Sequence, residues 1–246
     1  MKYIFLFIFI FISNANAEKN VLLIQSSLSG DISVTNKIGY KLLDKITKTK
    51  KYQKIHLKLR DLNKMPVANI SSDSIIAFYT PLEKQDDKIK KILEPSNLLA
   101  QEVLSADIII VCAPMYNFGI PASLKAWIDN IVRPGLTFKY TNKGVEGLIS
   151  DQTKVIIVTS SGGSYSSVEG QKMDFVSPYL KTIFGFMGVK NIEIISNEYS
   201  SSGEIKTFKS EDIKVGELSK DAMKYYHQIS DDKAISKKIN DIIISL

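Results

Sequence analysis

The residues best suited to chemistry in this sequence follow one another as Met115, Tyr116, Asn117 and Phe118. An all-apolar run typical of a buried parallel strand ends just before them, and an amphipathic segment begins shortly after. A strand, a turn and a helix start in this order place backbone N–H groups at the carboxyl edge of an α/β sheet, where nucleotides and related ligands bind. Two aromatic rings and an amide suit a flat ring with hydrogen-bonding edges better than a bare phosphate. The turn therefore indicates a flavin.

The backbone of this turn has a use of its own. Its N–H groups can donate to the pyrimidine oxygens of a flavin, where negative charge gathers on reduction. The alternative is a turn packed for stability alone, with Tyr116 and Phe118 in the core.

Two further polar turns follow predicted strands. The first carries hydroxyls ahead of a helix, and hydroxyls with free helix N–H groups can cradle a phosphate without a lysine. Serine and threonine are also ordinary helix caps, so capping and phosphate binding both stay open here. The other turn contains two glycines that permit close backbone approach. The residues concerned are Ser26, Ser27, Ser33 and Thr35 in the first turn, and Ser160, Ser161, Gly162 and Gly163 in the other.

Strands and helices alternate along the chain, which predicts an α/β fold with a doubly wound, five-stranded parallel sheet and helices on both faces. No internal repeat is evident, and a single domain over 18–246 is expected. The expected strands are 21–25, 53–59, 108–112, 154–159 and 192–196, and the expected helices are 33–48, 96–104, 122–132 and 174–187, with helical segments at the C-terminus. Residues 63–94 are expected to be loop-rich, and 135–149 to form a hairpin around Asn142-Lys143-Gly144. The turns after the first, third and fourth strands then share one edge, which implies one site.

Composition argues against several other classes of function. The formal net charge is +6, but the lysines are dispersed without interleaved aromatics, which disfavours nucleic-acid binding. The single cysteine, Cys112, excludes an intrachain disulfide and is expected to be buried, as is Trp127. His56 and His227 have no carboxylate or cysteine at ligand spacing, so a metal site and a Ser-His-Asp relay lack their parts. The absence of an acid–base pair fits flavin chemistry, which asks mainly for placement of the ring.

The first 17 residues have the pattern of a secretory signal peptide. Lys2 precedes an apolar run over residues 3–12, and Ala15-Asn16-Ala17 is a small-residue cleavage site. The run is short for a bilayer span, which takes about 20 residues. We expect cleavage after Ala17 and export to the periplasm or medium, without stable membrane insertion afterwards. A buried first strand and an uncleaved anchor are the alternatives.

Taken together, these stretches resemble the FMN-dependent NADH-azoreductases, a flavodoxin-like family related to the NAD(P)H:quinone oxidoreductases. The resemblance covers roughly residues 20 to 200 and includes a quite specific Pro-Met-Tyr-Asn-Phe run. It rests on Ser26-Ser27, Ser33-x-Thr35-Asn36, Ala113 to Phe118, Leu124-Lys125, Thr137 to Thr141, Glu146-Gly147-Leu148, Thr159 to Gly163, Pro178-Tyr179-Leu180 and Phe184-Gly185-Phe186.

This resemblance implies a homodimer that binds FMN at its subunit interface. NADH or NADPH would reduce the flavin and leave before two electrons pass to a quinone or an azo compound, in a ping-pong cycle. Tyr116, Asn117 and Phe118 would form the substrate face, with Tyr165 a weaker candidate. The implied cofactor-binding residues are Ser27, Ser33, Val34 and Thr35 at the phosphate, and Met115, Tyr116, Asn117, Phe118, Ser160, Ser161, Gly162 and Gly163 at the ring and ribityl chain.

The chain departs from the family pattern at three places. Val34 stands where a polar residue is common, Ser161 replaces a larger and often basic one, and residues 202–228 have no assignable counterpart. Two other functions stay open at the level of sequence. One is an exported, non-enzymatic flavodoxin-like carrier or flavin-binding protein, and the other is an interaction module without cofactor.

Overall fold

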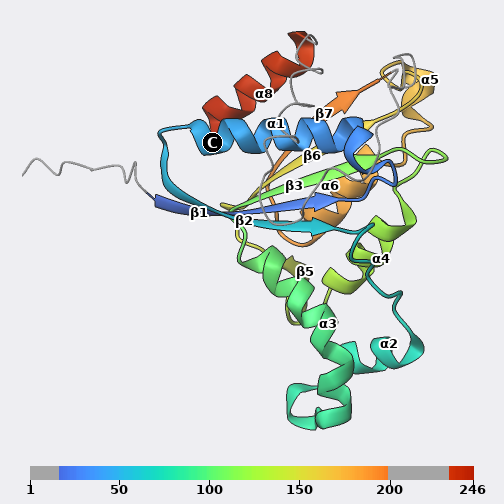
Figure 1. The fold of residues 1–246 in the computed structure, drawn as a ribbon. Helices are drawn as coiled ribbons and strands as arrows, with labels where there is room; N and C mark the ends of the chain where they lie inside the picture. The colour runs from blue at the N-terminus through green and yellow to red at the C-terminus, as the bar shows by residue number, and fades with distance from the viewer. Residues whose placement is uncertain (1–16, 199–232) are drawn as a thin grey trace, which may run out of the picture.

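A computed structural model describes residues 17–198 and 233–246 of the chain. The segment around 202–228 and His227 lie outside the described residues. Five parallel strands form one sheet in the order β2-β1-β3-β6-β7 (Figure 1). Counting these five strands alone, the order is 2-1-3-4-5, as expected for a flavodoxin-like sheet. The strands are β1 (Ala17–Gln25), β2 (Tyr52–Asp61), β3 (Ile108–Pro114), β6 (Lys154–Ser160) and β7 (Asn191–Asn197).

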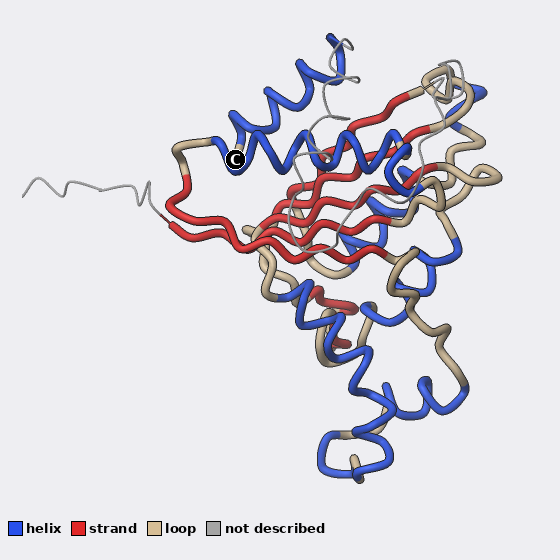
Figure 2. Tube along the Cα trace, viewed as in Figure 1, coloured by secondary structure: helices blue, strands red, loops and turns tan. Residues whose placement is uncertain are grey.

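Helices cover both faces of this sheet, as predicted. One face carries α1 (Val34–Lys48) and α8 (Lys233–Ser245), and the other carries α3 (Asp87–Leu104), α4 (Ala122–Ile131) and α6 (Ser177–Phe186) (Figures 1 and 2). Every residue of β3 and β6 is buried, because both faces of these central strands are covered. The alternate side chains of β3 divide between two cores, with Ile109 and Val111 in one and Ile108 and Ile110 in the other.

The helix predicted to begin at Ser96 begins nine residues earlier, at Asp87. The side chain of Asp86 caps its first turn by accepting a hydrogen bond from the N–H of Ile89, at 2.8 Å. Pro95 lies inside this helix rather than before it, which overturns the expected start. Both Pro95 and Lys91, whose carbonyl loses its helical partner, are exposed, so water can satisfy the freed group.

Residues 63–94 hold more regular structure than the sequence indicated. They include α2 (Ser72–Phe78), which begins with a capping box between Ser71 and Ser74. Together with the first turns of α3, this helix extends well away from the sheet (Figure 1). Ala77, Phe78 and Leu93 form a small separate core there, and the guanidinium of the buried Arg133 lies 3.9 Å from the centre of the Phe78 ring.

The other expected elements are present with small shifts. The hairpin consists of β4 (Phe138–Thr141) and β5 (Gly144–Gly147). The helix expected from 174 begins at Ser177, because the Asp174 carboxylate accepts hydrogen bonds from the N–H groups of Val176 and Ser177. A short helix, α5 (Val168–Gln171), was not predicted. Trp127 and Cys112 are buried as expected, and burial raises the pKa of the Cys112 thiol.

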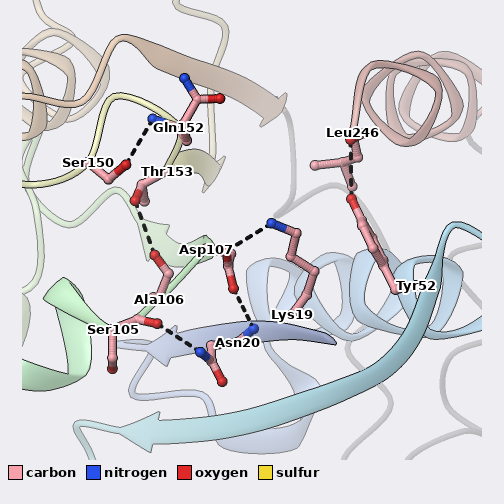
Figure 3. A network of polar contacts seen from close by, with 10 residues as sticks. All are labelled: Lys19, Asn20, Tyr52, Ser105, Ala106, Asp107, Ser150, Gln152, Thr153 and Leu246. Atoms are coloured by element: carbon pink, nitrogen blue, oxygen red, sulfur yellow. Dashed lines mark hydrogen bonds and ion pairs between the residues drawn. The ribbon is translucent and has the colours of Figure 1, made fainter. Parts of the chain in front are cut away.

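The amino edge of the sheet is closed by side chains of the chain itself (Figure 3). The Asp107 carboxylate accepts hydrogen bonds from Lys19 and from the N–H of Asn20, and the Thr153 hydroxyl donates to the carbonyl of Ala106. The C-terminal residue lies there too, because the Tyr52 hydroxyl donates to a Leu246 oxygen at 3.2 Å. The polar turns that the sequence singled out all lie at the opposite, carboxyl edge.

Close contact between α1 and β3 supports this arrangement and depends on Gly39. A Cβ atom at that position would collide with the Cys112 sulfur and lie 3.3 Å from Leu23 Cδ1. Alanine normally favours a helix over glycine by about 1 kcal/mol, but overpacking a core costs about 1–3 kcal/mol. We therefore expect Gly39→Ala to lower the free energy of unfolding, measured by urea denaturation. Adding Cys112→Ala should recover most of the loss, and a double variant no more stable than Gly39→Ala would contradict the predicted collision.

Candidate functional site

The three predicted turns meet at the carboxyl edge and are joined there by backbone hydrogen bonds. The N–H and the hydroxyl of Ser26 both reach the carbonyl of Cys112, at 3.2 and 2.7 Å. The N–H of Met115 donates to the carbonyl of Ser160 at 2.8 Å. Each turn is therefore fixed to the next strand of the sheet, and the prediction that they share one edge is confirmed.

The turn after β1 gathers hydroxyl groups beside the first turn of α1. Ser27, Ser33 and Thr35 are all buried, and the hydroxyls of Ser33 and Thr35 lie 3.0 Å apart. Ser33 is also the helix cap, because its oxygen accepts a hydrogen bond from the N–H of Asn36 at 3.3 Å. Among the described residues, the N–H groups of Val34 and Thr35 have no hydrogen-bond partner. Buried hydroxyls and unpaired N–H groups at a helix N-terminus form the kind of site that takes a phosphate.

The turn after β3 has an uncommon backbone conformation. Tyr116 and Gly119 exchange N–H to carbonyl hydrogen bonds at 2.9 and 3.0 Å, closing a two-residue loop. Both loop residues, Asn117 and Phe118, have positive φ angles of 49° and 68°, as in type I′ turns. Asparagine tolerates this region, whereas a phenylalanine held there stores strain of about 1–2 kcal/mol. Such strain is concentrated at functional sites.

Only part of this turn can donate hydrogen bonds to a ligand. The sequence indicated that N–H groups of residues 115–118 can donate to a flavin, but those of Met115 and Tyr116 are already bonded within the protein. Among the described residues, the N–H groups of Asn117 and Phe118 have no hydrogen-bond partner. Two adjacent donors on a strained loop thus remain for a flat ring with acceptor atoms.

The alternative was a turn packed for stability alone, with Tyr116 and Phe118 in the core, and neither side chain is fully buried. The Phe118 side chain is 47% exposed rather than in the core. Its ring meets the Tyr165 ring edge-on with centroids 6.5 Å apart, and its carbonyl accepts a hydrogen bond from the N–H of Phe175. Tyr116 is half-buried, and its hydroxyl reaches the turn after β1. The expected substrate face is thus exposed at Asn117 and Phe118 and half-buried at Tyr165, whereas the Tyr116 hydroxyl is bonded to the turn after β1.

The turn after β6 leaves room beside its glycines. The Ser161 hydroxyl donates to the carbonyl of Gly163 at 2.8 Å, and the Ser161 N–H donates to the carbonyl of Asn197. Apart from Gly163 and its two chain neighbours, no atom of the described residues lies within 4 Å of the place where a Cβ of Gly163 would stand. Contacts with the rest of the described chain therefore do not require glycine there, and the space is open to a ligand.

Glu198 is a residue of this edge that the sequence reasoning missed. Its carboxylate accepts hydrogen bonds from the Ser164 hydroxyl at 2.5 Å and from the N–H of Tyr165 at 2.9 Å. The hydrogen bond from Ser164 is the main reason why the pKa of Glu198 lies below its usual value. The signal available in the sequence was its place directly after β7, where a side chain reaches the same sheet edge. Glu198 holds the loop that carries Tyr165.

In the described part of the chain, no three His, Cys, Asp or Glu residues are grouped so that they could hold a metal ion. His56, which had no partner at sequence spacing, lies 2.7 Å from the Glu18 carboxylate across neighbouring strands, and this pairing lowers the pKa of Glu18. The pair lies well along β1 and β2 from the turns that form the site.

The fold and the three turns define a protein of the flavodoxin-like class. The sequence matches the flavodoxin-like fold family over residues 19–215, and the chain belongs to that family. It is 40% identical to the FMN-dependent NADH:quinone oxidoreductase of Herminiimonas arsenicoxydans, covering 74% of this chain and 88% of the relative. It is 39% identical to the protein of the same name from Psychromonas ingrahamii, covering 75% and 85%.

Solved structures agree with this assignment of the fold. The azoreductase from Bacillus anthracis str. Sterne superimposes with a TM-score of 0.70 at 20% identity, and the match covers 93% of this chain and 100% of the azoreductase. An FMN-dependent NADH-azoreductase from Bacillus anthracis str. Ames Ancestor, solved in complex with FMN, gives a TM-score of 0.64 at 22% identity, covering 90% and 98%.

The strain at Phe118 can be measured by comparing two small substitutions. At ordinary backbone angles alanine is at least as stable as glycine, but at a positive φ glycine avoids the clash of Cβ with the backbone. We expect Phe118→Gly to be more stable than Phe118→Ala by about 1 kcal/mol in urea denaturation. The matched pair is Tyr165→Gly and Tyr165→Ala, because Tyr165 contacts the same ring and has no positive φ. Equal stability of the two Phe118 variants would show that the loop is unstrained.

Proposed function

We propose that this protein is an FMN-dependent NADH:quinone oxidoreductase. The proposal depends on one observation: buried hydroxyls at the N-terminus of α1 share a sheet edge with the N–H groups of Asn117 and Phe118, which have no partner among the described residues. One end of this site suits a phosphate and the other a flat ring with acceptor atoms. The relatives that bear this name are covered over more than four-fifths of their length, at 88% and 85%.

The phosphate of FMN would be held by the turn after β1. The hydroxyls of Ser27, Ser33 and Thr35 can donate to its oxygens, as can the N–H groups of Val34 and Thr35. These donors lie at the positive end of the α1 dipole, which favours a doubly charged anion without a nearby lysine. Val34 keeps its backbone donor, so its apolar side chain does not argue against the site.

The ring of FMN would be held by the two other turns. The N–H groups of Asn117 and Phe118 are fixed by the closed loop, so they donate without reorganising. Gly162 and Gly163 allow the backbone after β6 to approach the ring and ribityl chain. FMN, when bound, carries two electrons from a nicotinamide to an acceptor. The protein contributes placement, exclusion of water and donors where negative charge develops.

The exposed Phe118 ring and its neighbour Tyr165 give one aromatic surface for the flat partners of the reaction. NADH and the acceptor would use this surface in turn, as a ping-pong order requires. Quinones and azo compounds both fit such a surface, and NADPH could replace NADH. The chain would thus serve more than one acceptor.

We also infer that the protein acts as a homodimer. Several aromatic side chains lie exposed around α2, the hairpin and the end of α6. Tyr79 and Tyr140 are 59% and 66% exposed, and Phe138 links Tyr140 to Phe186 through ring contacts. An exposed apolar cluster of this kind is typical of an interface between chains.

The N-terminus supports a proposal that the protein is exported after cleavage behind Ala17. The register between β1 and β2 is irregular between Ala17 and Glu18 and regular from Glu18 onward. Cleavage there would leave the regular pairing intact. Within the described residues, no helix is long and apolar enough to cross a membrane.

The enzymatic proposal predicts FMN binding, reduction by NADH and a phosphate role for Ser33. Purified protein should bind FMN, and NADH added without oxygen should bleach the bound flavin within seconds, whereas free FMN should bleach much more slowly. Bound flavin that stays yellow would favour the non-enzymatic carrier. Ser33→Ala should weaken FMN binding by roughly tenfold or more, because a hydroxyl donor to a charged group is lost.

Ser71→Ala is the matched control for this variant, because the Ser71 side chain caps α2 in the same way and α2 lies away from the carboxyl ends of β1, β3 and β6 (Figure 1). Both substitutions should cost about 1 kcal/mol of stability as lost caps. Only Ser33→Ala should lower the affinity for FMN in an equilibrium titration. Equal affinities in the two variants would mean that Ser33 is a cap and nothing more.

Processing and assembly can be tested by mass spectrometry of the protein recovered from its native host. The denatured chain should have the mass of residues 18–246, and the native ion should have twice that mass together with bound FMN. A chain retaining residues 1–17 would contradict cleavage. A monomeric ion at micromolar concentration would contradict the dimer.

A further inference from the structure

Tyr116 belongs to the turn after β3, but its hydroxyl contacts the turn after β1. It accepts a hydrogen bond from the N–H of Leu28 at 3.0 Å and lies 3.4 Å from the hydroxyl oxygen of Ser27. Ser27 in turn accepts a hydrogen bond from the N–H of Ser29 at 3.2 Å. One side chain from the turn after β3, which would hold the flavin ring, therefore completes the hydrogen bonding of the turn after β1, which would hold the phosphate.

Among the described residues, this contact supplies the hydrogen-bond partner of the Leu28 N–H. Leu28 and Ser29 are exposed, and Leu28 has a side chain that is 66% exposed. Gly30 follows with a positive φ of 52° and begins the short 3-10 turn Gly30–Ile32 that leads to α1, in which the carbonyls of Ser29 and Gly30 accept hydrogen bonds from the N–H groups of Ile32 and Ser33. Without the Tyr116 hydroxyl, Leu28 would lose its protein acceptor and the turn would have more conformations. A loop that must be ordered on binding lowers affinity for its ligand.

We infer that Tyr116 is a positioning residue for the FMN phosphate, rather than part of the substrate face. Its hydroxyl orders residues 27–29 and thereby sets where the Ser27 hydroxyl stands. Because Tyr116 also closes the ring-binding loop through its backbone, the two ends of the site are held at a fixed spacing. This inference rests on the proposed function, since it assumes that FMN occupies the edge.

The Tyr116→Phe variant tests this role, because it keeps the ring and removes the hydroxyl. FMN and riboflavin, which differ by the phosphate, are titrated against the flavin-free protein by fluorescence quenching. We expect the variant to bind FMN about 5- to 10-fold more weakly, as the loss of one hydrogen bond and some order implies. Affinity for riboflavin should change less than about twofold, because the backbone loop that holds the ring is intact.

A second measurement needs no ligand. Amide hydrogen exchange of a peptide covering residues 26–30 in the flavin-free protein should be faster in Tyr116→Phe than in the wild type, because the Leu28 N–H has lost its acceptor. Peptides from β3 should exchange at the wild-type rate, which shows that the variant is folded.

The matched control is Tyr52→Phe. It removes a hydroxyl that donates to Leu246 at the opposite edge of the sheet (Figure 3). This variant should keep both flavin affinities and the exchange rate of residues 26–30.

The outcomes separate this inference from the proposed function. Unchanged FMN affinity and unchanged exchange in Tyr116→Phe would overturn the inference while leaving the FMN site standing. An equal loss for FMN and riboflavin would also overturn it, by assigning the hydroxyl to the ring. A wild-type protein that binds neither flavin would overturn the proposed function and the inference with it.

Discussion

The pairing of β3 with β1 on one side and β6 on the other is the constraint on which the site depends. Parallel pairing brings the carboxyl ends of these strands to one edge, and the buried backbone groups there must find partners. Ser26 bonds to the carbonyl of Cys112, and Met115 bonds to the carbonyl of Ser160. The same bonds that end the strands therefore fix the three turns relative to one another. A site for a ligand longer than any one turn follows from this cross-linking.

The two edges of the sheet are used differently. At the amino edge, Asp107 and Tyr52 join strands and the C-terminal residue through bonds within the protein. At the carboxyl edge, the N–H groups of Asn117 and Phe118 have no partner among the described residues. The strained loop that holds these two donors is stable because bonds at Tyr116 and Gly119 close it. Donors for a ligand therefore lie at the carboxyl edge, where open α/β sheets bind their ligands.

Much of the fold could be predicted from local patterns. Strands 108–112 and 154–159 were evident from the apolar runs 108–112 and 155–158, and the hairpin was evident from its alternation around Asn142-Lys143-Gly144. The start of α3 was predicted wrongly because residues 63–94 were taken as loop-rich, whereas the helix begins at Asp87 and continues through the exposed Pro95. Short elements such as α2 escaped prediction because their stability comes from packing on α3 and Arg133 rather than from their own pattern.

The sequence by itself determined the order of the strands along the chain, the polar turns that follow them and so the class of ligand that the edge can hold. Only the tertiary structure decided which groups in those turns remain free. Met115 and Tyr116 use their N–H groups within the protein, the Tyr116 hydroxyl serves another turn, and Glu198 anchors a loop 33 residues earlier at Tyr165. Hydrogen bonds between residues distant in sequence decide which groups remain free, and a local sequence pattern does not predict such pairings.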